Sequence, residues 1–479
     1  MKKEVTFALN YALNKGFQIH PDAFKILENV DVKKLEKIIK EIVREKTKQK
    51  LFQINQDDLE TYLGIKEDLD LQSEIKVLSD PTLKITSGEG VKGYNALFSS
   101  RFNKLKRIIS DRPESRMLKS LASIKSAKFE DDLYVCGLVT EKKSERNITK
   151  LMLEDPSGSF EGIIFDDDLQ KTVDTLLLDQ FIMIRVGMGK NSGFIIKDII
   201  FPDIPEQVVN KSETEAYAVF LSDLHIGSKY FMEEEFSDFV AWLSSPDPVA
   251  RKIRFVLIGG DILDGVGIYP NQNKELVCQT IEEQLKKAEG LIDKIPKNIK
   301  IIIMPGNHDP GRRALPQPAI PKKYNSSLWE RENVIMIGNP SMISLNGVKV
   351  LMFHGQSIDD IVKTTPGMKY DEPTNVMRHL LKVRHLSPIY GSQTPIAPEM
   401  EDLLVIEDIP DIFHVGHVHK AQLDMYKGIL LVNSGSWQKQ TPFQASVGMT
   451  PNPGIALMVN LKTFQVFHQN YNSDSDNVL

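Results

Sequence analysis

The chain of 479 residues is too long for one ordinary domain, so two or three domains are expected. Its net charge of −6 argues against a uniformly basic nucleic-acid coat, although local basic patches can still attract a polyanion. Only two cysteines, Cys136 and Cys278, are present, which excludes a disulfide framework and a cysteine metal site. With no apolar run long enough to span a bilayer, we expect a cytoplasmic protein without a membrane partner.

Residues 1–64 are predicted to form a small helical domain. Apolar residues recur at helical spacing after Asp31, and a second short helix is expected over residues 57–63. The outer face is rich in Lys and Glu, which is typical of a solvated surface or of a partner-docking module. Residues 65–93 are polar without a sustained period and are expected to be a linker.

Residues 94–128 are predicted to form a basic helical connector. Helical spacing resumes over residues 94–109, and over residues 101–128 nine basic residues outnumber Asp111 and Glu114. Such an excess suits either contact with a nucleic-acid backbone or a solvated connector. The basic residues are Arg101, Lys104, Lys106, Arg107, Arg112, Arg116, Lys119, Lys125 and Lys128.

Five short alternating segments within residues 129–203, with a helix predicted over residues 167–178, resemble an OB fold, a small β-barrel. Acidic residues stand at the entrance to that helix, and aromatic residues are sparse. A barrel that binds single strands normally has a basic groove with exposed aromatics. The pattern therefore favours packing against the rest of the protein or a partner over direct DNA binding.

Polar side chains follow apolar runs at five places in the second half of the chain. Strand ends that converge on one edge bring such groups together, and mixed nitrogen and oxygen donors suit divalent metals of intermediate softness. The stretches are Ser222-Asp223-Leu224-His225, Gly259-Gly260-Asp261, Gly306-Asn307-His308-Asp309, His354-Gly355 and Gly416-His417-Val418-His419.

Seven groups are enough for two metal ions if Asp261 bridges them. Alternation along a strand is expected to point Asp223 and His225 at one ion, and His417 and His419 at the shared site. Two carboxylates against two divalent cations leave a positive centre that attracts a phosphodiester. The expected ligands are Asp223, His225 and His419 with Asp261 for one metal, and Asn307, His354 and His417 with Asp261 for the other.

This constellation, over residues 215–470, resembles the calcineurin-like metallophosphoesterase superfamily. The resemblance implies a four-layer α/β/β/α metallophosphoesterase sandwich. Together with the N-terminal helical module and the OB-fold β-barrel, it gives an expected α+β multidomain fold. Residues 471–479 are expected to be a flexible tail.

Further segments, residues 311–318, 384–391, 394–399 and 433–438, resemble the small exonuclease subunits of archaeal family D DNA polymerases. These are related to the B subunits of eukaryotic replicative polymerases. The resemblance implies a manganese-dependent 3′–5′ exonuclease that proofreads primer ends for a separate large catalytic subunit. It also implies a DNA primer-template as substrate and a sliding clamp reached through the complex. The residues alone leave iron, zinc and cobalt open as metals.

His308, the residue after the ligand Asn307, is assigned to the substrate: its imidazole stabilises charge on phosphorus or protonates the leaving oxygen. Asp309 is expected to orient that ring. In related double-strand-break repair nucleases a His stands three residues after the bridging Asp, where this chain has Asp264. An acid cannot clamp a phosphate, so either His308 acts alone or another cation contributes.

Arg312 and Arg313 are the candidate phosphate partners, with surface charges on a Pro-rich loop as the alternative. His385 is a third substrate candidate, or a buried hydrogen-bonded ring. Two other functions are kept open: a non-catalytic structural B subunit of the polymerase, and a phosphoesterase for small molecules or proteins.

Overall fold

The computed structural model describes residues 3–21, 23, 35–48, 51–55, 58–59, 73–124, 133–145, 148–189, 193–324, 326–446 and 448–472. The chain forms two compact units, residues 1–72 with 242–252 and residues 73–241 with 253–479. Among the helices of the described ranges, none combines the length and apolar character needed to cross a membrane.

The N-terminal unit is built on two helices, α1 (Lys3–Asn14) and α3 (Leu35–Lys48), and a parallel pair of short strands, β1 (Gln18–Ile19) and β2 (Gln53–Ile54). A helix of this length depends on packing for most of its stability. The buried face of α3 carries the apolar residues whose spacing predicts a helix, and it packs against Phe17 in one core. The helix predicted over residues 57–63 lies largely outside the described residues.

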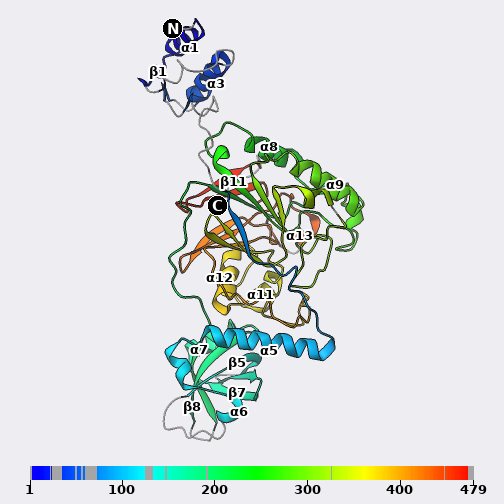
Figure 1. Cartoon of the computed structure of the whole chain (residues 1–479). Helices are drawn as coiled ribbons and strands as arrows, with labels where there is room; N and C mark the ends of the chain where they lie inside the picture. The colour runs from blue at the N-terminus through cyan, green and yellow to red at the C-terminus, as the bar shows by residue number, and fades with distance from the viewer. Residues whose placement is uncertain are drawn as a thin grey trace. The chain divides into compact units, whose positions relative to one another are not determined.

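A five-stranded barrel follows in the second unit (Figure 1). The strand order is β5-β6-β7-β9-β8, and pairing of β5 with β8 closes it. Helix α7 (Asp167–Asp174) begins at Asp166, whose side chain accepts a hydrogen bond from the backbone N–H of Leu169. One of the acidic residues at the helix entrance is therefore an N-cap. The strands are β5 (Leu133–Glu145), β6 (Ile148–Asp155), β7 (Gly158–Ile164), β8 (Phe181–Met188) and β9 (Phe194–Ile200).

Two six-stranded sheets form the rest of this unit. The first has the order β13-β12-β11-β10-β19-β20, in which β10 to β13 are parallel and β19 and β20 antiparallel. Its parallel strands are largely apolar, as expected where both faces are covered, and Arg254 and Lys300 are the charged exceptions. They are β10 (Tyr217–Leu221), β11 (Ile253–Gly259), β12 (Lys300–Met304) and β13 (Val334–Met336), joined by β19 (Ile455–Asn460) and β20 (Val466–Asn470).

The second sheet has the order β17-β18-β16-β15-β14-β3. Phe220 and Phe255 of the first sheet share a core with Met352 and Val432 of the second, so the two sheets pack face to face. The strands are β3 (Ile75–Ser79), β14 (Ser341–Leu345), β15 (Val348–Phe353), β16 (Ile412–Val415), β17 (Gln422–Tyr426) and β18 (Ile429–Asn433).

Helices cover the outer sides of the sandwich. Residues of α11 (Ile358–Thr364) and α12 (Pro373–Val383) share a core with Phe413 and Leu431 of the second sheet. Helix α9 (Ile281–Ile292) lies on the opposite side of the sandwich (Figure 1). The remaining elements are α5 (Gly90–Ile108), α6 (Leu121–Ile124), α8 (Glu233–Leu243), α10 (Ser326–Glu330), α13 (Pro442–Ser446), β4 (Leu118–Lys119), η2 (Pro113–Met117), η3 (Ala250–Lys252) and η4 (Gln272–Lys274).

Part of the predicted linker belongs to a sheet, which corrects that expectation. Strand β3 pairs antiparallel with β14, and Glu74 donates a backbone hydrogen bond to the side chain of Asn346. The sequence pattern does not predict this strand, because it is an edge strand whose residues are all partly or fully exposed and show no buried face.

The basic segment after residue 100 is largely neutralised by the protein itself. Arg101 is fully buried against Asp402, and Lys104 pairs with Glu401 and Glu407. Arg112 donates to three backbone carbonyls of residues 201–203. The two expectations, a nucleic-acid track and a solvated connector, therefore both fail at these three positions. Lys125 and Lys128 lie outside the described residues.

Candidate metal centre

The five polar stretches follow the carboxyl ends of five strands, β10, β11, β12, β15 and β16, taken from both sheets. Because these ends meet at one edge of the sandwich, the structure brings together all the groups expected to bind metal. Three of them, Asp223, His225 and His419, form one cluster, and Asp261, His354 and His417 form another. Asn307 lies beside His354.

Most of these residues have left-handed backbone conformations. The φ angles are 54° for Asp223, 51° for His225, 50° for Asp261, 72° for His417 and 57° for His419. Such angles are uncommon outside glycine and cost about 1–3 kcal/mol each, so they persist where the surroundings fix them. All five lie beyond their strands. Tight turns, not the expected strand alternation, therefore aim these side chains.

The first cluster has the spacing of donors around one ion. The Nε2 atoms of His225 and His419 lie 3.0 Å apart, and Oδ1 of Asp223 lies 3.5 Å from His419 Nε2 and 3.9 Å from His225 Nε2. Donors about 2.1 Å from one metal at tetrahedral or octahedral angles stand about 3.0–3.4 Å apart. Oδ1 of Asp223 is buried and has no hydrogen-bond partner among the described residues. An unpaired buried carboxylate oxygen is costly, and a cation satisfies it.

The second cluster shares a carboxylate with the first. Oδ2 of Asp261 lies 3.2 Å from His354 Nε2 and 4.0 Å from His225 Nε2, so it faces both groups of donors. The amide oxygen of Asn307 is 3.0 Å from His354 Nε2. This geometry is the one expected of a bridging carboxylate, and the donor set fits divalent metal ions.

The electrostatics of the second cluster favour positive charge. Burial alone lowers the pKa of His354, but the neighbouring Asp261 raises it to about 10. Burial alone raises the pKa of Asp261, yet His354 and His308 bring it well below its ordinary value. The carboxylate that draws a proton onto His354 equally favours a metal ion in the proton's place.

Each of the four ligand imidazoles is also held at its other ring nitrogen. His225 Nδ1 lies 3.1 Å from Asp264 Oδ1, and His354 Nδ1 lies 2.9 Å from the carbonyl of Gly259. Such contacts fix the orientation of a ligand ring. Asp264 therefore orients the His225 ring. It stands where the related nucleases have a histidine, but it does not replace that histidine as a partner for phosphate.

The supports of the other two imidazoles were missed in the sequence. Asp359 Oδ2 lies 3.1 Å from His417 Nε2, and Gln444 Nε2 lies 2.8 Å from His419 Nδ1. Asp359 stands in the first turn of the helix that follows His354, and its proximity to that motif is the only sequence signal. Gln444 comes from the short helix α13 and has no such signal.

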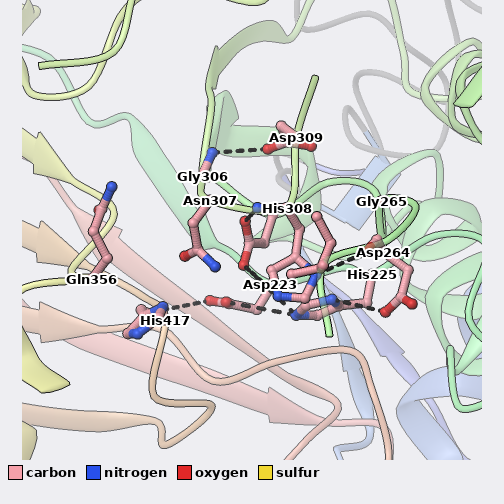
Figure 2. Close-up of polar contacts among 12 residues, drawn as sticks. Asp223, His225, Asp264, Gly265, Gly306, Asn307, His308, Asp309, Gln356 and His417 are labelled. Carbon is pink, nitrogen blue, oxygen red and sulfur yellow. Dashed lines mark hydrogen bonds and ion pairs between the residues drawn. The ribbon is translucent and has the colours of Figure 1, made fainter. Parts of the chain in front are cut away.

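His308 points into the site beside the first cluster (Figure 2). Its Nδ1 lies 2.7 Å from the carbonyl oxygen of Asp264, which leaves Nε2 facing the site, 3.9 Å from Asp261 Oδ2. Asp309 instead accepts backbone hydrogen bonds from Gly306 and Leu263, at 2.9 and 3.0 Å. It ties two loops together, which corrects the expectation that it orients the ring.

The three substrate candidates lie in different surroundings. Arg312 pairs with the buried Glu399 at 2.6 Å, whereas Arg313 is exposed and makes no hydrogen bond or ion pair within the described ranges. His385 is buried: its Nε2 lies 2.9 Å from Asp402, and its Nδ1 accepts from the backbone N–H of Ser387. Both ring nitrogens of His385 have protein partners, so the residue is a buried hydrogen-bonded ring, which was the alternative to contact with the substrate.

The two packed sheets, the barrel and the clustered donors define a mixed α/β protein with a candidate site for divalent metal ions. The family model for the B subunit of DNA polymerase alpha/epsilon matches residues 218–423. A DNA polymerase II small subunit from Archaeoglobus fulgidus is 41% identical over 386 residues, covering 79% of this chain and 77% of its own length. That from Methanothermobacter thermautotrophicus is 36% identical over 397 residues, covering 81% of each chain.

The chain therefore belongs to the family of small subunits of DNA polymerase II, the archaeal family D polymerase, and the resemblance seen in its sequence is confirmed. A solved structure of an archaeal phosphodiesterase aligns with 53% of this chain and 98% of its own, at 12% identity and a TM-score of 0.26. A likeness that distant carries no argument about activity.

Proposed function

We propose that this chain is the 3′–5′ exonuclease subunit of a heteromeric archaeal DNA polymerase and removes mismatched primer ends. The observation that carries the proposal is the shared carboxylate: Oδ2 of Asp261 faces imidazoles of both donor clusters. Two divalent ions, most suitably manganese, supply an activated water and neutralise charge on the phosphate when they are bound.

The chain's own groups supply position and proton transfer. His225, His354, His417 and His419 are held at their second nitrogens, so their ring orientations are set before any metal or substrate arrives. His308 presents Nε2 to the site and serves the phosphate or the departing sugar oxygen. Exposed Arg313 is available to a phosphate of the strand.

An aromatic pair supports a nucleic-acid substrate over a small phosphoester. The rings of Tyr269 and Phe443 stack with centroids 6.1 Å apart and an interplanar angle of 17°, and Phe443 is 57% exposed. Phe443 immediately precedes Gln444, which contacts the ligand His419. Exposed aromatic faces of this kind are stacking platforms for bases.

The test is digestion of a primer-template with a mismatched 3′ end by the purified chain in manganese. A 5′-labelled primer should shorten one nucleotide at a time, and a 3′-labelled primer should release labelled mononucleotide first. Asp261→Asn should lower the rate at least about 10²–10³-fold, as expected when charge stabilisation in a reacting site is removed. His308→Ala should also lower it while leaving manganese binding intact. Full activity in both variants would falsify the proposal.

A Phe443→Ala variant separates the substrate classes. It should weaken binding of a single-stranded oligonucleotide, since one stacked base contributes about 1–3 kcal/mol. It should leave hydrolysis of a small aryl phosphodiester at the wild-type rate. Faster turnover of the small ester than of DNA by the wild-type chain would favour the phosphoesterase alternative.

A structural subunit is the second candidate, and the neutralised basic segment favours it. Arg101, Lys104 and Arg112 are occupied by protein acceptors and offer little to a DNA backbone. In either case the relatives, which are small subunits of a polymerase, imply a large catalytic subunit as partner. A chain that binds the large subunit and yet holds no metal after incubation with manganese would establish the structural role.

A further inference from the structure

A cavity of about 950 Å³ opens in the second unit, away from the metal donors. It lies between the end of α5, the segment after the last barrel strand, the end of α12 and the β17–β18 turn. Its lining holds the side chains of five basic residues and three acidic ones, which leaves two positive charges in excess. The basic residues are Arg107, Arg112, Lys382, Arg384 and Lys427; the acidic ones are Asp111, Asp203 and Glu407.

Three of the basic side chains are committed to protein acceptors. Arg112 donates to the carbonyls of residues 201–203, and Lys427 donates to Asp203 and to the carbonyl of Ile204. Arg107 pairs with Glu407. These contacts shape the cavity wall and leave Asp203 already engaged.

The other two basic side chains keep donors unused. Arg384 is 3% exposed and donates through Nε and Nη2 to the carbonyls of Ile406 and Glu407, while its Nη1 makes no hydrogen bond among the described residues. The Lys382 ammonium lies 3.9 Å over the ring of Phe201 and has no hydrogen-bond or ion-pair acceptor within the described ranges. A half-buried ammonium without an acceptor is costly.

The backbone holds Arg384 in an unusual position. It ends α12 with a φ of 56°, where glycine or asparagine is the common choice. Burial and the nearby Arg112 lower the pKa of Arg384 to about 10, and burial likewise lowers the pKa of Lys382. Like charges are therefore gathered at a site where water is partly excluded.

We infer that this cavity binds a phosphate group, held between the Lys382 ammonium and the free Nη1 of Arg384. A guanidinium edge beside a compact ammonium is a common arrangement for phosphate oxygens, and a phosphate dianion matches the two excess charges. Apolar side chains beside these cations, among them Phe201 and Ile204, suit the sugar or base that such a phosphate carries. Either a free nucleotide or the backbone of a DNA strand supplies this chemistry.

The experiment uses the full-length Asp261→Asn protein freed of metal, so that the donor clusters do not bind phosphate. Inorganic phosphate, a deoxynucleoside monophosphate and a short single-stranded oligonucleotide are titrated calorimetrically. At least one probe should bind, and Lys382→Gln should weaken it about 10-fold or more, the loss expected for a charge-assisted hydrogen bond. Lys382→Arg should retain most of the affinity.

Lys286→Gln is the matched control, because it removes the same charge from an exposed position on α9. It should leave phosphate and mononucleotide binding unchanged. If a strand is the ligand, Lys382→Gln should also reduce the slope of log affinity against log salt by about one. A free nucleotide as ligand instead gives tight mononucleotide binding at one site per chain.

The inference is overturned if none of the three probes binds, or if Lys382→Gln and Lys286→Gln behave alike. Binding of an acidic peptide in place of all three probes would overturn it too, because that result assigns the cavity to a protein partner. None of these outcomes depends on nuclease activity, since the experiment measures binding to the metal-free Asp261→Asn protein.

Discussion

Two buried clusters of histidine and aspartate stand in contrast in this molecule. At the metal centre, Asp223 keeps one carboxylate oxygen without a hydrogen-bond partner among the described residues, and the Nε2 atoms of His225 and His419 face each other at 3.0 Å. Away from the metal centre, Asp402 accepts from Arg101 at 2.8 Å, from His385 at 2.9 Å and from a backbone N–H. Burial of the two aspartates is equally complete.

The two clusters differ in how many protein hydrogen-bond donors reach the carboxylate oxygens. The Arg101 guanidinium and the His385 ring lower the pKa of Asp402 against the opposing effect of burial, and the carboxylate has all the partners it needs. At the candidate metal centre, by contrast, Oδ1 of Asp223 has no hydrogen-bond donor among the described residues. A buried Asp–His pair therefore indicates a ligand site only where its atoms face one another unsatisfied.

Breaking the Arg101–Asp402–His385 cluster should have the largest effect on stability. Arg101→Met leaves Asp402 buried without its guanidinium, and losing one partner of a buried ion pair costs about 3–5 kcal/mol. The free energy of unfolding, followed with urea, should fall by that amount while manganese affinity stays at the wild-type value. Arg101→Met combined with Asp402→Leu should recover much of the loss. A matching fall in manganese affinity would show that the two clusters are not independent.

Weakening the outer support of the metal centre should have an intermediate effect. Asp264→Asn removes the carboxylate that lies 3.1 Å from His225 Nδ1. Loss of such a contact typically lowers metal affinity about 10–100-fold. Calorimetric titration with manganese measures it. Asp360→Asn is the control, because that buried carboxylate accepts from the backbone of residues 393 and 394, not from a ligand ring. Equal affinity in Asp264→Asn and the wild type would remove Asp264 from the centre.

The sequence predicted the elements that are defined locally. The apolar runs that precede the five polar stretches correspond to β10, β11, β12, β15 and β16, whose residues are almost all buried. The edge strands β3 and β17 were not predicted, because exposed edge strands carry little apolar pattern. The partner of β3, β14, is also distant in the chain.

The expected metal donors stand in short motifs, which is why the sequence alone could name the seven groups that the structure brings together. Their supports could not, because Gln444 reaches His419 only through tertiary packing. The same reason explains the basic segment. Arg101 has the sequence context of a surface charge, because its buried partner Asp402 lies 301 residues away in the chain.

A further buried histidine, His379, sharpens the comparison, because the charged groups near it are lysines and not carboxylates. His379 on α12 is 6% exposed, and its Nε2 has no hydrogen-bond partner within the described part of the chain. Burial lowers its pKa to about 4, and the nearby Lys382 and Lys142 add to the effect. An unsatisfied imidazole nitrogen alone is therefore no metal site.

The consequence is a dependence of stability on pH with a defined sign. The pKa of His379 is depressed in the folded state, so its unfolded form binds the extra proton between an ordinary pKa of about 6.5 and the folded value of about 4. Stability is present above that window and is lost as the pH falls through it. From pH 7.5 to 5.5 the loss of unfolding free energy should be about 1.3 kcal/mol.

His379→Leu should be less sensitive to this change in pH by that amount in urea unfolding of the metal-free protein. Val376→Ala on the same helix should lower stability equally at both pH values. If the wild type and His379→Leu lose the same free energy on acidification, the pKa of His379 is not depressed in the folded state, and the contrast with the carboxylate-lined centre does not hold.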